Sequence, residues 1–200
     1  MSILTLAGKK IGVGVTGSFC TISNVIDVLK ELKEKGADIY PIASENVTKF
    51  DTRFGKAEDF IKDIEEISGK KVVTTVVEAE KFGPSVSLDL MVLFPLTGSS
   101  LGKFANGIND NAPLMAAKAT LRNQKPVTIG IYTNDALGIS GENIFKLLNC
   151  KNIYFVPFGQ DDYVNKPKSM TSKVDLVVKT IEMALENKQI QPVIVENFAK

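Results

Sequence analysis

The sequence predicts an α/β domain with a doubly wound, mostly parallel six-stranded sheet and helices on both faces, formed by residues 1–200 as one unit. Short β-branched runs alternate with amphipathic stretches of helical period, which is the pattern of repeated βαβ units. Several runs are continuously apolar, as strands buried on both faces of a parallel sheet are. The length suits one domain, and no internal repeat or long linker divides the chain.

Each expected strand is a short run of β-branched or other apolar residues that ends near a turn-forming or hydroxyl residue. The six runs cover residues 10–16, 38–43, 72–77, 88–94, 127–132 and 152–156. The segment 159–167 is polar and rich in turn residues, so we expect it to project from the body of the domain.

The expected helices have apolar residues spaced three and four apart. Val25, Leu29 and Leu32 share one face of the first helix, and Gly36 ends it. Ile64 lies on the apolar stripe of the second helix, which ends at Gly69. The predicted helices cover residues 21–35, 56–68, 102–109, 112–123, 142–149 and 173–186.

The composition excludes several classes of function. The 24 Lys and Arg residues balance 23 Asp and Glu residues, so the chain lacks the excess positive charge that binds nucleic-acid phosphates. It has no histidine, which excludes a Ser-His-Asp triad, a Cys-His pair and an HExxH zinc site. Cys20 and Cys150 have no metal-ligand spacing. No apolar run reaches the roughly 18–20 residues that span a bilayer, so a soluble, cytoplasmic protein is expected.

Residues 16–18 (Thr-Gly-Ser) end the first expected strand and lead directly into the first helix. In open α/β sheets, ligands bind beyond the carboxyl ends of the strands, and a helix N-terminus attracts phosphate. Gly17 allows the backbone to approach a ligand, and the Ser18 hydroxyl can donate to it. A tight turn capped by Ser18, with no ligand, is the alternative. Gly12 and Gly14 complete a GxGxxG match, but both lie inside the strand, so no dinucleotide motif is assigned.

Small hydroxyl and amide side chains follow three later strands as well. Ser44 follows the second strand, Thr97 and Ser100 follow the fourth, and Thr133 and Asn134 follow the fifth. Ser44 taken alone is more typical of a turn or helix cap. Because the carboxyl ends of parallel strands meet at one edge of the sheet, the loops together predict a cradle for a phosphate attached to a flat organic group.

These loops resemble, in order and spacing, the FMN-binding loops of the flavoprotein family that includes the homo-oligomeric flavin-containing cysteine decarboxylases and the flavin prenyltransferases. The resemblance covers about residues 9–150 and includes Pro95 and the Lys103 to Asn111 segment. It implies trimers, or multiples of trimers, with the flavin at the boundaries between copies of the chain. It also implies that the first loop and Ser44 hold the phosphate and the later loops surround the rest of FMN. The cofactor residues that it implies are Gly17, Ser18, Ser44, Thr97, Ser100, Asn106, Thr133 and Asn134.

Longer stretches resemble one branch of that family, the B subunits of dipicolinate synthases. The resemblance implies a sporulation enzyme of the mother cell of a spore-forming bacterium, with the A subunit of dipicolinate synthase as its partner. The implied reaction oxidises a dihydrodipicolinate-type precursor to dipicolinate, which is pyridine-2,6-dicarboxylate. The stretches that carry the resemblance are residues 51–56, 115–123, 133–138, 152–162 and 191–196.

Two departures from the flavoprotein pattern bear on function. The decarboxylases have a histidine near the first helix and this chain has none, so cysteine decarboxylation is not expected. Ser99, or Gly98 in a shifted register, replaces an asparagine in the loop after the fourth strand. Three interpretations stay open: a flavin-assisted oxidoreductase component, a non-catalytic partner or scaffold with a vestigial FMN or phosphate site, and a stand-alone enzyme resembling the prenyltransferases or decarboxylases.

The implied oxidation needs a cofactor because no side chain accepts a hydride, so FMN is expected, or a nicotinamide (NAD or NADP) shared with the A subunit. Cationic partners suit a dicarboxylate substrate. Arg53 and Lys103 are the candidate substrate ligands, although a surface role for Arg53 and a loop-capping role for Lys103 fit equally well. Asp110 and Asp135 are candidate proton acceptors, with a turn or helix cap as the alternative for Asp110. No metal site is expected.

Overall fold

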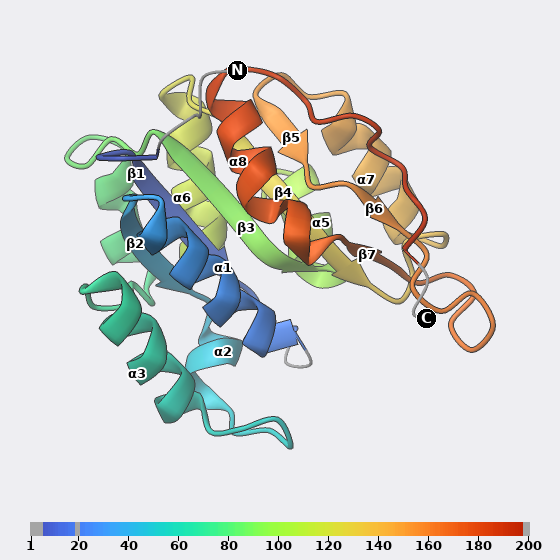
Figure 1. The fold of residues 1–200 in the computed structure, drawn as a ribbon, viewed down its shortest axis with the longest axis horizontal. Helices are drawn as coiled ribbons and strands as arrows, with labels where there is room; N and C mark the ends of the chain where they lie inside the picture. The colour runs from blue at the N-terminus through green and yellow to red at the C-terminus, as the bar shows by residue number, and fades with distance from the viewer. Residues whose placement is uncertain (1–5, 19–20, 198–200) are drawn as a thin grey trace.

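One sheet of seven strands lies between two layers of helices in the computed structural model, which describes residues 6–18 and 21–197 (Figure 1). The strand order is β2-β1-β3-β4-β7-β6, and β5 pairs with β4 beyond this path. The predicted α/β fold with a mostly parallel sheet is therefore confirmed. Cys20, which the sequence analysis singled out, lies outside the described residues.

Five strands run parallel to their neighbours and two short ones do not. The parallel strands are β1 (Lys10–Val15), β2 (Asp38–Ala43), β3 (Leu90–Thr97), β4 (Val127–Thr133) and β5 (Ile153–Phe155). The short strand β7 (Met170–Ser172) pairs antiparallel with the end of β4 and with β6 (Phe158–Gly159).

The prediction of six strands was wrong in two places. Residues 72–77 form no strand, because only Val73 bridges to β2 and Thr75 starts the helix α4 (Val76–Ala79) through a capping box with Glu78. The two short strands β6 and β7 were missed because they contain two and three residues. Runs this short carry no readable alternation, and tertiary pairing alone forms them.

Most helices begin and end close to the predicted positions. The short helices α2 (Glu45–Lys49) and α4 were not predicted, and α5 (Gly98–Ala105) begins and ends four residues before the predicted 102–109. It begins at Gly98 because the Thr97 side chain accepts a hydrogen bond from the Ser100 N–H at 3.3 Å and caps the helix there. The other helices are α1 (Ile22–Glu34), α3 (Ala57–Ser68), α6 (Ala112–Arg122), α7 (Ser140–Leu148) and α8 (Val177–Leu185), with 3-10 turns at Glu80–Phe82 and Val174–Leu176.

The core consists of two apolar clusters, one on each face of the sheet. Helices α1, α3 and α8 cover one face, and α5, α6 and α7 cover the other (Figure 1). Strand β3 contributes to both, since Val92 and Phe94 pack on one side while Met91 and Leu93 pack on the other, and all four are fully buried. This burial on both faces explains why the sequence of β3 is continuously apolar.

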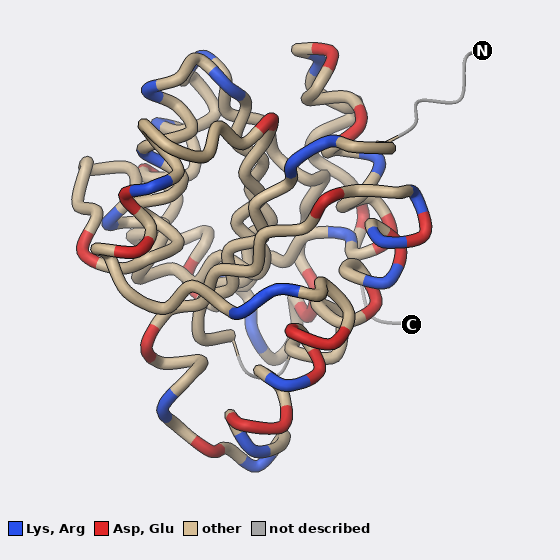
Figure 2. The backbone as a smooth tube through the Cα atoms, turned by 90° about the vertical axis from the view of Figure 1, so that its left-hand side faces the viewer, with Lys and Arg blue, Asp and Glu red and all other residues tan. Residues whose placement is uncertain are grey.

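The surface carries charges of both signs. Figure 2 shows Lys and Arg positions interspersed with Asp and Glu positions along the chain, as the net charge of +1 requires. Among the described residues, no helix has the length and apolar character needed to cross a membrane.

Candidate functional site

The strand order creates a crevice at the carboxyl ends of β1 and β3. Strand β1 lies between β2 and β3, so the chain leaves β1 toward one side of the sheet and β3 toward the other, which opens a ligand-binding crevice at this switch point. Thr16 ties the two strand ends together. Its hydroxyl donates to the Pro95 carbonyl at 2.8 Å and accepts from the Thr97 N–H at 3.0 Å. The sequence analysis placed Thr16 in the first loop, but nothing in the sequence indicates that its hydroxyl makes these two hydrogen bonds.

A cavity of about 490 Å³ opens at this crevice, and we call it the cradle. It brings together five residues that the sequence analysis proposed as ligands, four for the cofactor and one, Lys103, for the substrate. The residues that line the cradle are Gly17, Ser44, Glu45, Asn46, Thr97, Ser99, Ser100, Lys103, Asp110 and Asn111.

The Ser44 hydroxyl is the most informative group in the cradle. Ser44 is 7% exposed, and its Oγ atom is buried with no hydrogen-bond partner among the described residues. Ser44 stands at the N-cap position of α2, yet its side chain makes no capping bond. An unsatisfied buried hydroxyl costs about 1–3 kcal/mol. A ligand that offers a hydrogen-bond acceptor would remove this cost, so the residue fits a phosphate oxygen.

The N-terminus of α5 supplies the other donors. Its first N–H groups, at Gly98 and Ser99, have no partner within the helix because of helix geometry, and the helix dipole favours an anion there. Gly98 is needed for packing, because a Cβ atom at this position would lie 2.6 Å from the Thr133 hydroxyl and 3.1 Å from an Asp135 carboxylate oxygen. Thr133 at the end of β4 and Asp135 in the following loop thus pack closely against the first residue of α5.

The charged groups of the cradle leave one carboxylate in excess and no unpaired ammonium group among the lining residues. Lys103 forms an ion pair with Asp110, with 2.6 Å between Nζ and Oδ2, and Glu45 adds a second carboxylate. The ammonium group is therefore already paired, and Asp110 has the role of its partner. An anion in the cradle would be held by hydroxyl and backbone N–H donors together with the helix dipole.

A second cavity of about 780 Å³ lies on the other side of the first loop, since Gly17 lines the cradle and Ser18 lines this cavity. We call it the adjoining cavity. It contains three more of the predicted cofactor residues, Ser18, Thr133 and Asn134. Its remaining lining residues are Thr21, Asn24, Asp27, Val28, Glu31, Tyr132, Asp161, Lys166, Thr171, Ser172, Lys173, Val174, Asp175 and Asn197.

Thr133 is held in place by a carboxylate. Its hydroxyl is hydrogen-bonded to Asp135, whose Oδ1 also accepts from the Ser140 hydroxyl at 2.8 Å. Asp135, a candidate proton acceptor in the sequence analysis, is thus engaged in bracing the loop after β4. Ser140 carried no signal in the sequence, because nothing there indicates that the first residue of α7 turns back toward the strand.

Asn106 lies outside both cavities, at the C-terminal end of α5. Its amide nitrogen donates to the Gly102 carbonyl at 2.8 Å, and its amide oxygen accepts from the Lys146 ammonium at 2.9 Å. One chain therefore does not bring Asn106 together with the other predicted flavin ligands, and its role in flavin binding stays a prediction.

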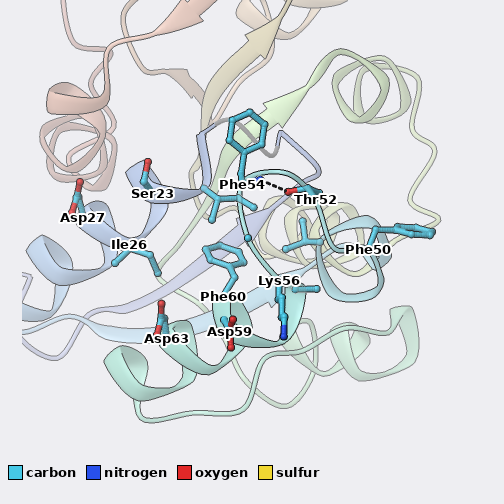
Figure 3. A pocket seen from close by; sticks show the side chains of 14 residues that line it. Ser23, Ile26, Asp27, Phe50, Thr52, Phe54, Lys56, Asp59, Phe60 and Asp63 are labelled. Atoms are coloured by element: carbon cyan, nitrogen blue, oxygen red, sulfur yellow. Dashed lines mark hydrogen bonds between the residues drawn. The ribbon is translucent and has the colours of Figure 1, made fainter.

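Arg53 also lies apart from the two cavities, in the loop before α3. Its guanidinium stacks over the Phe54 ring, 4.8 Å from the ring centroid. The same loop borders a groove of about 440 Å³ against α1 and α3. Figure 3 shows the aromatic side chains of Phe54 and Phe60 in this groove, with Asp59 and Asp63 beside them on α3. Arg53 is not among the residues that line it.

Asp161, Lys166 and Lys173 are site residues that the sequence analysis missed. They line the adjoining cavity, but in the sequence Asp161 and Lys166 belong to a polar segment that was expected to project. The segment does loop out from the body of the domain (Figure 1), while Asp161 and Lys166 lie beside the cavity, close to where β7 pairs with β4 through Tyr132 and Thr171.

Comparison with known proteins agrees with the geometry. Residues 4–185 match the flavoprotein family. The chain is 49% identical over 194 residues to the B subunit of dipicolinate synthase from Bacillus subtilis (strain 168), covering 97% of each chain. A match of this extent includes the strands and helices as well as the loops at their ends, so the chain shares its ancestry with this relative along almost its whole length.

Solved structures extend the comparison. The crystal structure of the B subunit of dipicolinate synthase from Bacillus halodurans C has 47% sequence identity and a TM-score of 0.90, covering 97% of this chain and 100% of that one. An FMN-dependent cysteine decarboxylase, SpaF, has 20% identity and a TM-score of 0.67, covering 91% and 98%. The decarboxylase shares the fold.

Proposed function

The chain belongs to the flavoprotein family, and on this premise we propose that it is the B subunit of a dipicolinate synthase. The identity of 49% across 97% of both chains supports this role. We propose that it acts with an A subunit in the cytoplasm of a sporulating mother cell. The proposed reaction converts a dihydrodipicolinate-type precursor to dipicolinate, and the ring loses a hydride and a proton as it becomes aromatic.

FMN is the proposed cofactor, and the cradle is its proposed phosphate site. The observation that carries this assignment is the buried, unpartnered Ser44 hydroxyl beside the N-terminus of α5. When bound, FMN supplies an acceptor for the hydride; a nicotinamide held by the A subunit is the alternative acceptor. Gly17, Ser44, Thr97 and Ser100 would hold the phosphate. Ser18, Thr133 and Asn134 line the adjoining cavity, where they would meet the rest of the cofactor or its substrate.

A homo-oligomer would explain the two predicted ligands that lie apart. Asn106 and Arg53 are outside both cavities of their own chain, so we propose that they serve the site of a neighbouring copy, as flavin sites at the boundaries within a trimer would require. The test is the oligomeric state in solution and its change on Arg53→Ala, which should leave the fold of one chain intact because, within the described part of the chain, the Arg53 guanidinium stacks on the neighbouring Phe54 alone.

Titration of the purified chain with FMN, followed by flavin fluorescence and visible absorbance, tests the cofactor assignment. Thr97→Asp keeps a side chain able to cap α5 but places a negative charge beside the phosphate. We expect at least tenfold weaker FMN binding, because a like charge in a site disfavours the anion. Thr75→Asp is the matched control, since Thr75 caps α4 in the same way but does not line the cradle.

The outcomes separate the proposed function from its competitor. Binding that is weakened by Thr97→Asp and unaffected by Thr75→Asp supports a flavin site. Wild-type protein that binds no FMN, either alone or together with the A subunit, would overturn FMN as the cofactor. Activity of the two subunits with a nicotinamide would then identify the alternative acceptor, and no activity would identify a non-catalytic partner with a vestigial site.

A further inference from the structure

The adjoining cavity has walls that are fixed by hydrogen bonds before any ligand binds. The Tyr132 hydroxyl donates to the Ser172 carbonyl at 3.0 Å, and the Asn197 amide donates to the Thr171 carbonyl at 2.7 Å. Asn197 is thus tied to β7, and β7 to β4. The size of the adjoining cavity is in the range of small-molecule sites, and the cavity is lined mainly by polar and charged residues and shares the first loop with the cradle.

Two unpaired ammonium groups distinguish the adjoining cavity from the cradle. Lys166 and Lys173 both line it, and neither forms an ion pair with any residue that the structure describes. Their backbones are anchored: the Lys166 N–H donates to Asp162 and the Lys173 N–H donates to Pro157, each at 2.8 Å. In the cradle, by contrast, Lys103 is already paired with Asp110. The cations available to a carboxylate ligand are therefore in the adjoining cavity.

A carboxylate of the same cavity lacks a hydrogen-bond donor. The Oδ1 atom of Asp161 is buried and has no partner among the described residues. An ionised carboxylate only accepts hydrogen bonds, so the group that completes it must be an N–H or O–H. Asp27, Glu31 and Asp175 line the cavity as well, which gives four carboxylates against two ammonium groups. This balance favours a ligand that offers a hydrogen-bond donor beside its carboxylates over one that has carboxylates alone.

We infer that the adjoining cavity binds a small cyclic acid that carries two carboxylate groups of its own and also a ring N–H or hydroxyl group. Lys166 and Lys173 would bind the carboxylates, and Asp161 would accept from the ring donor. The inference rests on the proposed function in one respect, because it takes this acid to be the substrate of the proposed reaction. It assigns substrate binding to residues other than Arg53 and Lys103.

Calorimetric titration with two probes tests the inference, in the presence and absence of FMN. Piperidine-2,6-dicarboxylate has a ring N–H, whereas pyridine-2,6-dicarboxylate has none. We expect Lys166→Met and Lys173→Met each to weaken both probes about tenfold, the usual loss for one charge-assisted hydrogen bond. Asp161→Asn should weaken only the piperidine acid. Lys62→Met, on the exposed face of α3, is the matched control and should change neither.

FMN affinity and melting temperature, measured on the same variants, distinguish a loss of acid binding from a loss of flavin binding and from a loss of folding. The inference predicts that both stay close to wild type. The inference is overturned if the wild type binds neither probe, or if the lysine variants bind both probes as tightly as the wild type does. It is also overturned if the lysine variants lose FMN binding but keep acid binding, because the cavity would then belong to the flavin. Failure of FMN to bind the wild type overturns the proposed cofactor alone, since acid binding is measured without it.

Discussion

Replacing Ser44 with alanine should change stability in opposite directions with and without ligand. In the free protein the Ser44 hydroxyl is buried without a partner among the described residues, and it forms no cap on α2 that alanine would remove. Deleting it therefore removes an unsatisfied polar group. In the FMN complex the same hydroxyl is proposed to donate to the phosphate, so deleting it removes a charge-assisted hydrogen bond.

The two effects have estimable sizes. An unsatisfied buried hydroxyl costs about 1–3 kcal/mol, and the small void left by its removal offsets part of the gain, so Ser44→Ala should raise the free energy of unfolding by up to about 1 kcal/mol. A hydrogen bond to a charged group contributes about 1.5–3 kcal/mol, which corresponds to roughly 10- to 100-fold weaker FMN binding. At FMN concentrations about 100 times the wild-type Kd, the ligand stabilises the wild type by about 2.7 kcal/mol and the variant by far less.

The assay is urea unfolding of both proteins, followed by circular dichroism, at zero and saturating FMN. The variant should have the higher midpoint without FMN and the lower midpoint with it. Thr128→Val is the matched control, because the Thr128 hydroxyl is also buried and unpartnered within the described part of the chain but lies within β4 and lines neither cavity. It should stabilise the protein at both FMN concentrations. A destabilised free Ser44→Ala protein, or one whose midpoint rises with FMN as much as the wild type, would refute the reasoning.

Two further predictions concern packing and pH. Gly98→Ala should destabilise the protein by roughly 1–3 kcal/mol in urea unfolding, because its Cβ would lie 2.6 Å from the Thr133 hydroxyl; Gly102→Ala, in the same helix with its nearest contact at 3.6 Å, should be neutral or stabilising. Hydrogen bonds from Lys71 and from the Val72 N–H lower the pKa of Glu65. The contribution of Glu65 to the free energy of unfolding is therefore fully present above its ordinary pKa of 4.5 and disappears as the pH falls through the lowered pKa. Glu65→Gln should lower the free energy of unfolding by about 0.5–1 kcal/mol at pH 7 and by less at acidic pH. An equal loss at both ends of a pH series of unfolding curves would contradict this prediction.

The elements that the sequence predicts well are those whose own pattern determines them. Strand β3 is apolar because both of its faces are buried, and α1 follows from its amphipathic spacing. Residues 72–77 look like a strand by composition, but the capping box of Thr75 and Glu78 starts a helix within them. Strand β7 has no pattern of its own, since three residues pair where the fold of the whole chain presents a partner.

The site follows the same rule. Gly17, Ser44, Thr97 and Ser100 meet because each follows a strand of one parallel sheet, and strand ends can be identified in a sequence. The position of Lys173 depends instead on the antiparallel return of β7, which is a tertiary event. Sequence reasoning therefore anticipated that these hydroxyl residues lie together, but it did not single out the lysines of the adjoining cavity; the ligand roles of both groups stay predictions.

The first loop explains how one chain can offer two chemically different cavities side by side. Thr16 fixes this loop to β3 through hydrogen bonds to Pro95 and Thr97, so consecutive residues face different spaces: Gly17 the cradle and Ser18 the adjoining cavity. The cradle presents hydroxyl groups and a helix N-terminus, with its lysine neutralised, whereas the adjoining cavity presents unpaired ammonium groups and an unsatisfied carboxylate. A phosphorylated cofactor and a smaller acid that carries its own donor would each find their complement in one of two cavities that share the first loop, and a reaction between the two requires such proximity.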